Sequence, residues 1–308
     1  MKKATFNLHS LGFAFQAVKE NHGCAGVDGV TIERFEKRLN ENLKTLEDEL
    51  TRHTYFPLPL MKILVEKKNG EPRNLYIPTV RDRVIQKAFL QDLEYILEKE
   101  FEDCSFAYRK GRSVRQAIYK IKEYYEEGYQ WVVDADIDAF FDNVDHGLLL
   151  TKFKGIVHDP QAHSLIEMWL KSEIWDGSSL TVTRKGIPQG SPISPIMANL
   201  FLDELDEEMM QKGYSYVRYA DDFVILCKTS VDAKKALQLS KQVLGKLLLE
   251  LDEEEITSFD KGFKYLGVNF LRSMIMKPFE QVNKRNKLIF YPEPFNIKAY
   301  LLKKKRGW

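Results

Sequence analysis

Two aspartates stand side by side in RYADDFVILC, which spans residues 218–227. The surrounding residues are typical of a buried strand, but adjacent carboxylates repel each other and lose hydration on burial. A hairpin resolves the conflict, because pairing of 217–219 with 223–226 would leave Ala220, Asp221 and Asp222 at the turn. A divalent cation there would also relieve the repulsion, since Mg²⁺ binds carboxylate oxygens and substrate phosphates. The alternative is a solvated polar turn without chemistry.

A second group of acids lies in YQWVVDADIDAFFDNV (129–144). This segment begins as a predicted strand, on which Asp134, Asp136 and Asp138 share one face and apolar residues take the other. Carboxylates from neighbouring strands could hold two metal ions about 3.5–4 Å apart, the arrangement used for in-line phosphoryl transfer. Spacing alone does not choose among the three acids.

The elements that must position these acids are helices and strands in irregular order. Apolar periodicity predicts helices over 31–53, 82–101, 112–128, 161–173, 196–211 and 231–250. Strand and turn patterns predict a hairpin at 60–78, a strand and Gly/Pro-rich loop at 178–195, two short strands within 214–228 and a late strand at 263–271. Because there is no regular βαβ series, the pattern favours an α+β fold with helices packed on a sheet.

Composition and charge limit the class of protein. The chain has 308 residues, of which 44% are hydrophobic and 30% charged, so it suits one large domain or two to three subdomains. The net charge of +1 means that any basic surface is local; the tail KAYLLKKKRGW is either solvated or a nucleic-acid contact. Three cysteines without metal spacing, and no signal-peptide or membrane-length apolar run, predict a soluble cytoplasmic protein.

Six motifs in order give the sequence a family resemblance. The chain resembles bacterial reverse transcriptases of the group II intron-like lineage over roughly residues 25–271. The motifs are GEPRNLYIPTVRDRVIQKAF (70–89), SFAYRKGRSVRQAI (105–118), DIDAFFDNVDH (136–146), GIPQGSPISPIMANLFLDELD (186–206), YADD (219–222) and KYLGVNFL (264–271).

The resemblance implies an α+β right-hand polymerase, with fingers and palm around an antiparallel sheet. Residues 1–115 would form an N-terminal segment and fingers, and 116–271 the palm, with an interleaved fingers segment at about 150–190. Residues 272–308 would be a short thumb-like or partner-binding basic tail, because 37 residues are few for the family's helical thumb. For the same reason a complete mobile intron protein is not expected.

The resemblance also implies the catalytic residues. Asp136, Asp221 and Asp222 would be catalytic and, with Ile137, would form the metal-binding set for two Mg²⁺ ions, for which Mn²⁺ can substitute. The choice of Asp136 follows the family pattern D-I-x-x-F-F-D. The expected reaction is attack of a primer 3′-hydroxyl on the α-phosphate of an incoming nucleotide.

The implied nucleotide-binding residues come from three motifs. Arg73, with Lys67 as helper, would contact the triphosphate, because a planar guanidinium suits phosphate. Phe141 would exclude a 2′-hydroxyl and so favour deoxynucleotides, although a Phe-Phe pair after a strand is also typical of a core. Gln189 and Gly190 would line the pocket, where glycine lets the backbone approach a base pair.

Template and primer contacts are implied at two places. One is YRKGRS (108–113), with Arg109, Lys110 and Arg112 as phosphate contacts, although an ordinary helix-entry loop is the alternative. The other is Tyr219 in the YADD motif.

Several functional alternatives remain open at the level of sequence. Expected substrates are an RNA template, a DNA or RNA primer and dNTPs. The sequence does not determine the oligomeric state. IPTVRDRVIQKA and AYRKGRSVRQAI favour the CRISPR-associated branch, whose partner is a CRISPR integrase, with a phage-defence role as nearest competitor. The other classes are an RNA-templated RNA polymerase and a catalytically altered polymerase-fold protein that only binds nucleic acid.

Overall fold

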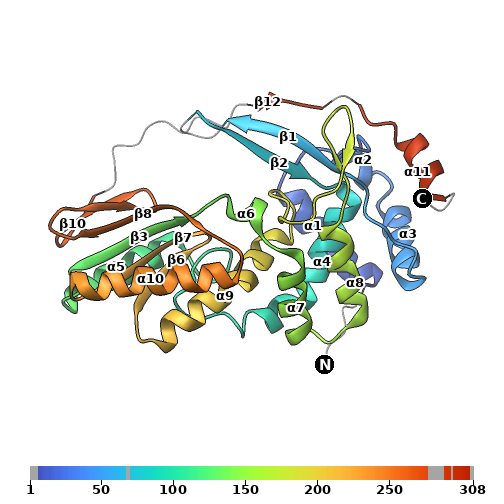
Figure 1. Cartoon of the computed structure of the whole chain (residues 1–308). Helices are drawn as coiled ribbons and strands as arrows, with labels where there is room; N and C mark the ends of the chain where they lie inside the picture. Colours follow the sequence, from blue (N-terminus) through green and yellow to red (C-terminus); the bar gives the residue numbers. More distant parts are fainter. Residues whose placement is uncertain (1–5, 67–69, 277–287, 293, 306–308) are drawn as a thin grey trace.

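The acid-bearing strands belong to a four-stranded sheet in the order β6-β7-β3-β8, with every neighbouring pair antiparallel. The computed structural model describes residues 6–66, 70–276, 288–292 and 294–305 (Figure 1). We refer to this sheet and its covering elements as the palm. Its strands are β3 (Trp131–Ile137), β6 (Ser215–Tyr219), β7 (Asp222–Cys227) and β8 (Leu251–Ser258).

The palm sheet is covered on both faces, because residues along β3 and β7 alternate between two apolar clusters. Val133, Ala135 and Ile137 face the main core, together with α9 (Ser194–Gln211) and α10 (Ser230–Lys246). Val132 faces the second cluster, formed with α5 and the hairpin β9–β10. The bounds of these elements are Val114–Glu126 for α5, Phe263–Tyr265 for β9, Val268–Leu271 for β10 and Met274–Met276 for β11.

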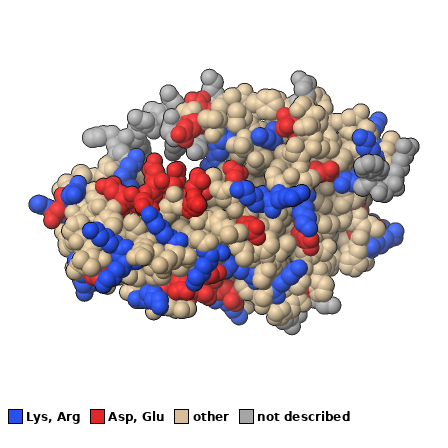
Figure 2. All heavy atoms as spheres, in the orientation of Figure 1, with Lys and Arg blue, Asp and Glu red and all other residues tan. Residues whose placement is uncertain are grey.

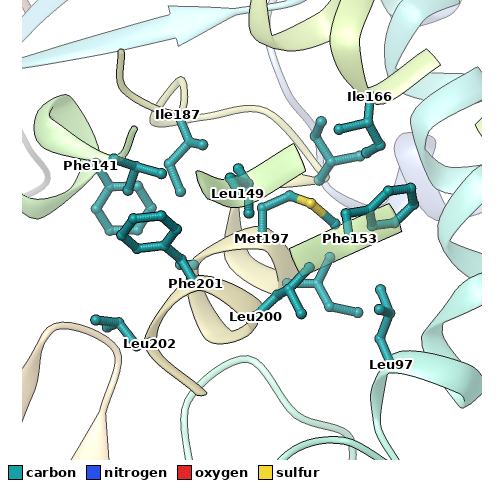
Figure 3. Close-up of a cluster of buried hydrophobic side chains, with 14 of the residues drawn as sticks. Leu97, Phe141, Leu149, Phe153, Ile166, Ile187, Met197, Leu200, Phe201 and Leu202 are labelled. Carbon is teal, nitrogen blue, oxygen red and sulfur yellow. The ribbon is translucent and has the colours of Figure 1, made fainter. Parts of the chain in front are cut away.

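The main core continues from the palm into a group of helices (Figure 3). Figure 3 shows Phe153 and Met197 close together, with Leu97 and Ile166 also in the cluster. These side chains come from α4, α7, α8 and α9. The helices are α1 (Leu8–Glu20), α4 (Val80–Leu97), α6 (Phe140–Asn143), α7 (His146–Ile156) and α8 (Pro160–Leu170).

A buried carboxylate fixes the start of α4. Thr79 caps this helix, and its hydroxyl donates to the Asp82 carboxylate at 2.6 Å. The same carboxylate accepts from Tyr55 at 2.9 Å and from the backbone N–H of Leu58 at 3.1 Å. The Thr79–Asp82 part of the IPTVRDRV motif thus binds the start of α4 to residues 55–58.

The second large sheet, which we call the fingers sheet, is built around β1. Strand β2 pairs antiparallel along β1 through six residue pairs. The other partners of β1 are β4, paired in parallel at Leu60 and Met61, and β12, paired antiparallel at Leu64 and Val65. The strands are β1 (Leu60–Glu66), β2 (Pro72–Ile77), β4 (Ile174–Trp175), β5 (Leu180–Thr181) and β12 (Leu288–Phe290).

The C-terminal segment therefore returns to the fingers sheet, as Figure 1 shows at the upper right. After β12, helix α11 (Ile297–Lys305) packs with Tyr300 in the third apolar cluster, which also contains Met61 and Ile63 of β1. The Tyr300 hydroxyl donates to the Glu173 carboxylate at 2.6 Å. The assignment of the tail as thumb-like or partner-binding stays a prediction.

The predicted hairpin at 60–78 is confirmed, and two other elements differ from expectation. The helix expected over 31–53 is two helices, α2 (Ile32–Glu36) and α3 (Leu39–Thr51). The break is stabilised because the Asn42 side chain donates to the Phe35 carbonyl at 2.9 Å, replacing a helical bond. The strand expected over 263–271 is the hairpin β9–β10, whose turn residues Leu266 and Gly267 have φ of 49° and 77°. No helix in the described part of the chain is long and apolar enough to cross a bilayer.

Candidate active site

The two predicted groups of acids meet at one end of the palm sheet. Strands β3 and β7 pair with Asp134 opposite Val224 and Ala135 opposite Phe223, so Asp136 lies beside Asp222. Tyr219 pairs with Asp222 at the end of the β6–β7 hairpin, which leaves Ala220 and Asp221 as its two-residue turn. The predicted hairpin is confirmed, but Asp222 is the first residue of β7 and not part of the turn. Asp138 lies beyond the end of β3 and is exposed.

The acids shift one another's pKa values. Burial and the charge of Asp221 raise the pKa of Asp136. Burial, then the charges of Asp136, Asp221 and Asp134, raise the pKa of Asp222 to about 7. Burial and the charge of Glu255 raise the pKa of Asp134 to about 6. Asp222 is exposed to solvent, and the charges of its acidic neighbours make its own charged form costly unless a cation is bound.

These residues fit a magnesium site in their donor chemistry. The Asp136 carboxylate accepts the backbone N–H of Ile137 at 3.0 Å, which orients it at the end of β3. Within the described ranges, no three His, Cys, Asp or Glu side chains form a ready-made metal cage. Mg²⁺ commonly binds one or two carboxylates and completes its shell with water and substrate phosphates, so Asp136, Asp221 and Asp222 would supply part of the shell.

A groove of about 680 Å³ runs beside the acids. It is lined by Asp134, Asp136 and Asp222, by the β8 residues Glu253–Glu255, and by Lys264–Gly267 of the β9–β10 hairpin. Figure 2 shows acidic side chains gathered along this upper edge of the palm. The acids of β8 were not predicted as site residues, although the run LDEEE (251–255) contains them.

Arg218 anchors the turn that carries Asp221. This side chain is fully buried and binds the Asp206 carboxylate through two guanidinium nitrogens, one of them at 2.7 Å. It also donates to Asn199 Oδ1 at 3.1 Å and to the Ala220 carbonyl at 2.9 Å. Ala220 has a φ of 62°, which a non-glycine residue rarely adopts, so the Arg218 contact stabilises a strained backbone.

The segment 104–109 lies against the outer edge of β6. The backbone N–H of Arg218 donates to the Cys104 carbonyl at 2.9 Å, and that of Phe106 donates to the Arg218 carbonyl at 3.0 Å. The Ser105 hydroxyl accepts from Arg218 at 2.9 Å, and Asn199 donates to the Ala107 carbonyl at 2.8 Å. The catalytic turn and this segment are therefore held by the same side chains.

The predicted template contacts differ in how accessible they are. Arg109 is buried, and its guanidinium bonds to Glu98 at 2.8 Å, to the Ser105 carbonyl at 2.9 Å and to the Phe101 carbonyl at 3.2 Å. This environment favours a loop-holding role over a phosphate contact for Arg109. Arg112 is paired with Asp103, whereas Lys110 is exposed. Tyr219 is half-buried at the end of β6.

The fingers sheet and the loop formed by Pro188, Gln189 and Gly190, which we call the Pro-Gln-Gly loop, bring three predicted nucleotide-pocket residues together. The Arg73 guanidinium on β2 donates to the Gln189 side chain, and the Gln189 carbonyl accepts the Tyr76 N–H at 2.7 Å. A Cβ added to Gly190 would lie 2.9 Å from the Tyr76 carbonyl oxygen, and its φ is 111°. Only glycine fits this approach without strain. Lys67 lies outside the described residues.

Phe141 belongs both to the core and to a second groove. Phe141 is only 7% exposed, and the centroid of its ring lies 5.3 Å from that of the Phe140 ring. Figure 3 shows Phe141 near Ile187 and Phe201. It also borders a groove of about 550 Å³ that includes Tyr76 and Gly186. The two roles predicted for Phe141, a residue that excludes a 2′-hydroxyl and a core residue, are compatible, because the core can fix the ring while its edge faces the groove.

Comparison of the sequence with known protein families gives a match that includes all three acids. The family described as "Reverse transcriptase (RNA-dependent DNA polymerase)" matches residues 65–270. The chain belongs to this family, and its enzyme class is RNA-directed DNA polymerase.

Two curated relatives support the assignment. Protein YkfC of Escherichia coli (strain K12) is 32% identical over 288 residues, covering 80% of this chain and 76% of YkfC. Group II intron-encoded protein LtrA of Lactococcus lactis subsp. cremoris is 29% identical over 342 residues, covering 88% of this chain and 57% of LtrA. The resemblance to the group II intron-like lineage is confirmed.

A solved structure supports the fold. Telomerase from Candida albicans, solved with a fragment of telomeric RNA, aligns with a TM-score of 0.58 at 13% identity. The alignment covers 80% of this chain and 49% of that one. The predicted α+β polymerase fold with antiparallel sheets is confirmed.

Proposed function

We propose that this protein extends the 3′-hydroxyl of a DNA or RNA primer with dNTPs, copying an RNA template by a two-metal mechanism. The observation that carries the proposal is the convergence of Asp136 from β3 with Asp221 and Asp222 from the β6–β7 hairpin. Two bound Mg²⁺ ions would activate the primer hydroxyl and neutralise the leaving pyrophosphate. Burial and the charges of Asp136 and Asp221 raise the pKa of Asp222 to about 7, and a bound cation would relieve both costs of its charged form.

The protein's own residues would bind and orient the nucleotide. Arg73 would exchange its bond to Gln189 for contacts to the triphosphate, for which a guanidinium is well suited. Gly190 lets the loop lie directly against β2, which would place the loop backbone close to the nucleotide. Phe141, fixed by the core, would exclude a 2′-hydroxyl and select deoxynucleotides.

Primer extension on an RNA template with Mg²⁺ and dNTPs is the direct test. We expect Asp221→Ala and Asp222→Asn each to abolish incorporation while primer–template binding survives. Unchanged incorporation in either variant would refute the site assignment. Persistent incorporation by wild type in excess chelator would refute the metal requirement.

The choice of nucleotide distinguishes the proposed enzyme from an RNA-templated RNA polymerase. Wild type should incorporate dNTPs much faster than NTPs, and Phe141→Val should raise NTP incorporation relative to dNTP incorporation. Equal use of both by wild type would favour the RNA polymerase alternative. Binding of primer–template without any incorporation would favour a catalytically altered nucleic-acid-binding protein.

For the biological setting we propose a cytoplasmic CRISPR-linked system, with a phage-defence role as the alternative. The support is the similarity of IPTVRDRVIQKA and AYRKGRSVRQAI to the CRISPR-associated branch. The cysteines, Cys24, Cys104 and Cys227, are free thiols, which suits a reducing compartment. Co-purification of a CRISPR integrase encoded by neighbouring genes would support this setting, and a neighbourhood of other defence genes would favour the alternative.

A further inference from the structure

Tyr108 reaches the catalytic turn because of the direction in which its segment runs. Ser105 pairs with Arg218 as a parallel β-bridge. Two parallel segments advance in the same direction, so residues 106–108 proceed alongside residues 219–221. The chain direction thereby carries Tyr108 toward the turn, close enough for the charge of Asp221 to act on its hydroxyl.

Tyr108 is held in a conformation that a bulky residue rarely adopts. Its φ is 61°, and its side chain is 49% exposed. Ala220, in the neighbouring turn, has a φ of 62°. Core packing does not explain a strained tyrosine that is about half exposed, and such strain is concentrated at functional sites.

Buried polar contacts on either side hold Tyr108 in place. Before it, the Ala107 carbonyl accepts from Asn199 at 2.8 Å, and Asn199 in turn accepts from Arg218. After it, Arg109 is bound to the Ser105 carbonyl at 2.9 Å. The backbone on both sides of the tyrosine is therefore fixed, while its ring is free to contact a ligand.

Charged groups from both halves of the proposed site act on the Tyr108 hydroxyl. Burial and the charge of Asp221 raise its pKa, Arg73 lowers it, and Tyr219 and Asp222 add smaller increases. Arg73 is the proposed triphosphate ligand, and Asp221 and Asp222 are the proposed metal ligands. The tyrosine thus lies in the field of both sets of groups that would hold an incoming nucleotide.

We propose that Tyr108 is a substrate-binding residue whose ring packs against the nascent base pair of the incoming nucleotide; this inference rests on the proposed polymerase function. A neutral aromatic residue suits the position. A cationic side chain would compete with metal ions for the acids, and an acidic one would repel the triphosphate, whereas an aromatic ring packs against a base regardless of sequence.

The test uses steady-state primer extension with Tyr108→Gly, because glycine adopts a positive φ without strain. We expect its melting temperature to be unchanged or higher and its KM for dNTP to rise about tenfold or more. The Kd for primer–template should stay within about twofold of wild type. Tyr108→Phe, which keeps the ring, should retain a near-wild-type KM.

The matched control is His53→Gly, because His53 is also exposed with a positive φ, 54°, but lies at the end of α3. His53→Gly should relieve backbone strain without changing the KM for dNTP. If Tyr108→Gly does not fold, Tyr108→Asn serves instead, since asparagine tolerates this backbone region.

A wild-type KM for dNTP in Tyr108→Gly or Tyr108→Asn would overturn the inference, as would a loss confined to primer–template affinity. These outcomes are distinct from failure of the proposed function, in which wild type itself incorporates no nucleotide and both proposals fall together.

Discussion

The palm and the fingers keep charged groups in opposite environments. In the palm, Arg218 and Asp206 are both fully buried, and their ion pair is linked to the turn that carries Asp221. In the fingers, Arg73 is exposed on β2 and its guanidinium donates to the Gln189 side chain. Buried charge costs desolvation and is retained only with complete hydrogen bonding, whereas an exposed guanidinium can exchange partners. The palm is thus suited to fix acids, and the fingers to bind and release a substrate.

The two regions are also stabilised differently. Both faces of the palm sheet are covered, one by side chains of the main core and the other by side chains of the second apolar cluster. The fingers sheet depends on the C-terminal segment, since β12 pairs with β1 and Tyr300 packs against residues of β1. The fingers sheet therefore takes part of its stability from the C-terminal segment.

Arg218→Met should give the largest loss of stability and thereby test the role of buried charge in the palm. It leaves Asp206 buried without its partner, which costs about 3–5 kcal/mol in the free energy of unfolding. Urea denaturation measures the change. Lys241→Met, which breaks the more exposed Lys241–Glu254 pair, is the control and should cost less than about 1 kcal/mol. Similar losses in both variants would contradict the contrast.

Tyr300→Ala tests whether the C-terminal segment stabilises the fingers. Removing this buried ring and its bond to Glu173 should cost about 3 kcal/mol and speed amide exchange in β1. Leu302→Ala, at an exposed position of the same helix, should change stability by about 0.5 kcal/mol or less. Unchanged β1 exchange in Tyr300→Ala would show that α11 does not support the sheet.

Gly190→Ala tests the contact between the Pro-Gln-Gly loop and β2. A Cβ there meets the Tyr76 carbonyl at a positive φ, so we expect a loss of about 1–3 kcal/mol and a raised KM for dNTP. Gly245→Ala, in α10 with open space around it, should instead stabilise by about 0.5–1 kcal/mol. A Gly190→Ala protein with wild-type stability and KM would refute the close approach.

The pH dependence of the metal-free palm should be the smallest effect. Asp222 has a pKa raised to about 7, so the folded protein binds its proton more tightly than the unfolded chain does. Stability contributed by this proton is complete below the unfolded pKa and is lost as pH rises toward about 7. In chelator, the melting temperature should therefore fall modestly from pH 5 to pH 8. Asp222→Asn or added Mg²⁺ should reduce this fall; an unchanged slope in both would contradict it.

Local sequence patterns predicted much of the fold. The alternation VVDADI predicted β3, and the turn signal at 68–72 predicted the β1–β2 hairpin. The break between α2 and α3 was missed because both helices turn apolar residues toward one core, so the periodicity continues across it. The β9–β10 turn was missed because its first positive-φ residue is Leu266, a type that does not usually mark a turn.

Site residues that belong to a family motif could be predicted from the sequence. Properties that depend on tertiary contacts, such as burial and shared electrostatics, could not. Asp136, Asp221 and Asp222 were selected from motif order, but their shared electrostatics follow from the β3–β7 register. From the sequence, Arg109 resembles a phosphate contact, because the sequence does not show that its side chain is buried. The exposed, strained Tyr108 was overlooked beside its charged neighbours.

Paired acids, an arginine on a hairpin and a Gly-containing loop, in the order of a reverse transcriptase, could all be read from the amino-acid order. The support of the acidic turn by Arg218, the burial of Arg109 and the pairing of the C-terminal strand with the fingers sheet could be seen only after folding. Motifs reflect local preferences and residue chemistry, whereas burial, pKa shifts and strand partners depend on segments that become neighbours only when the chain folds.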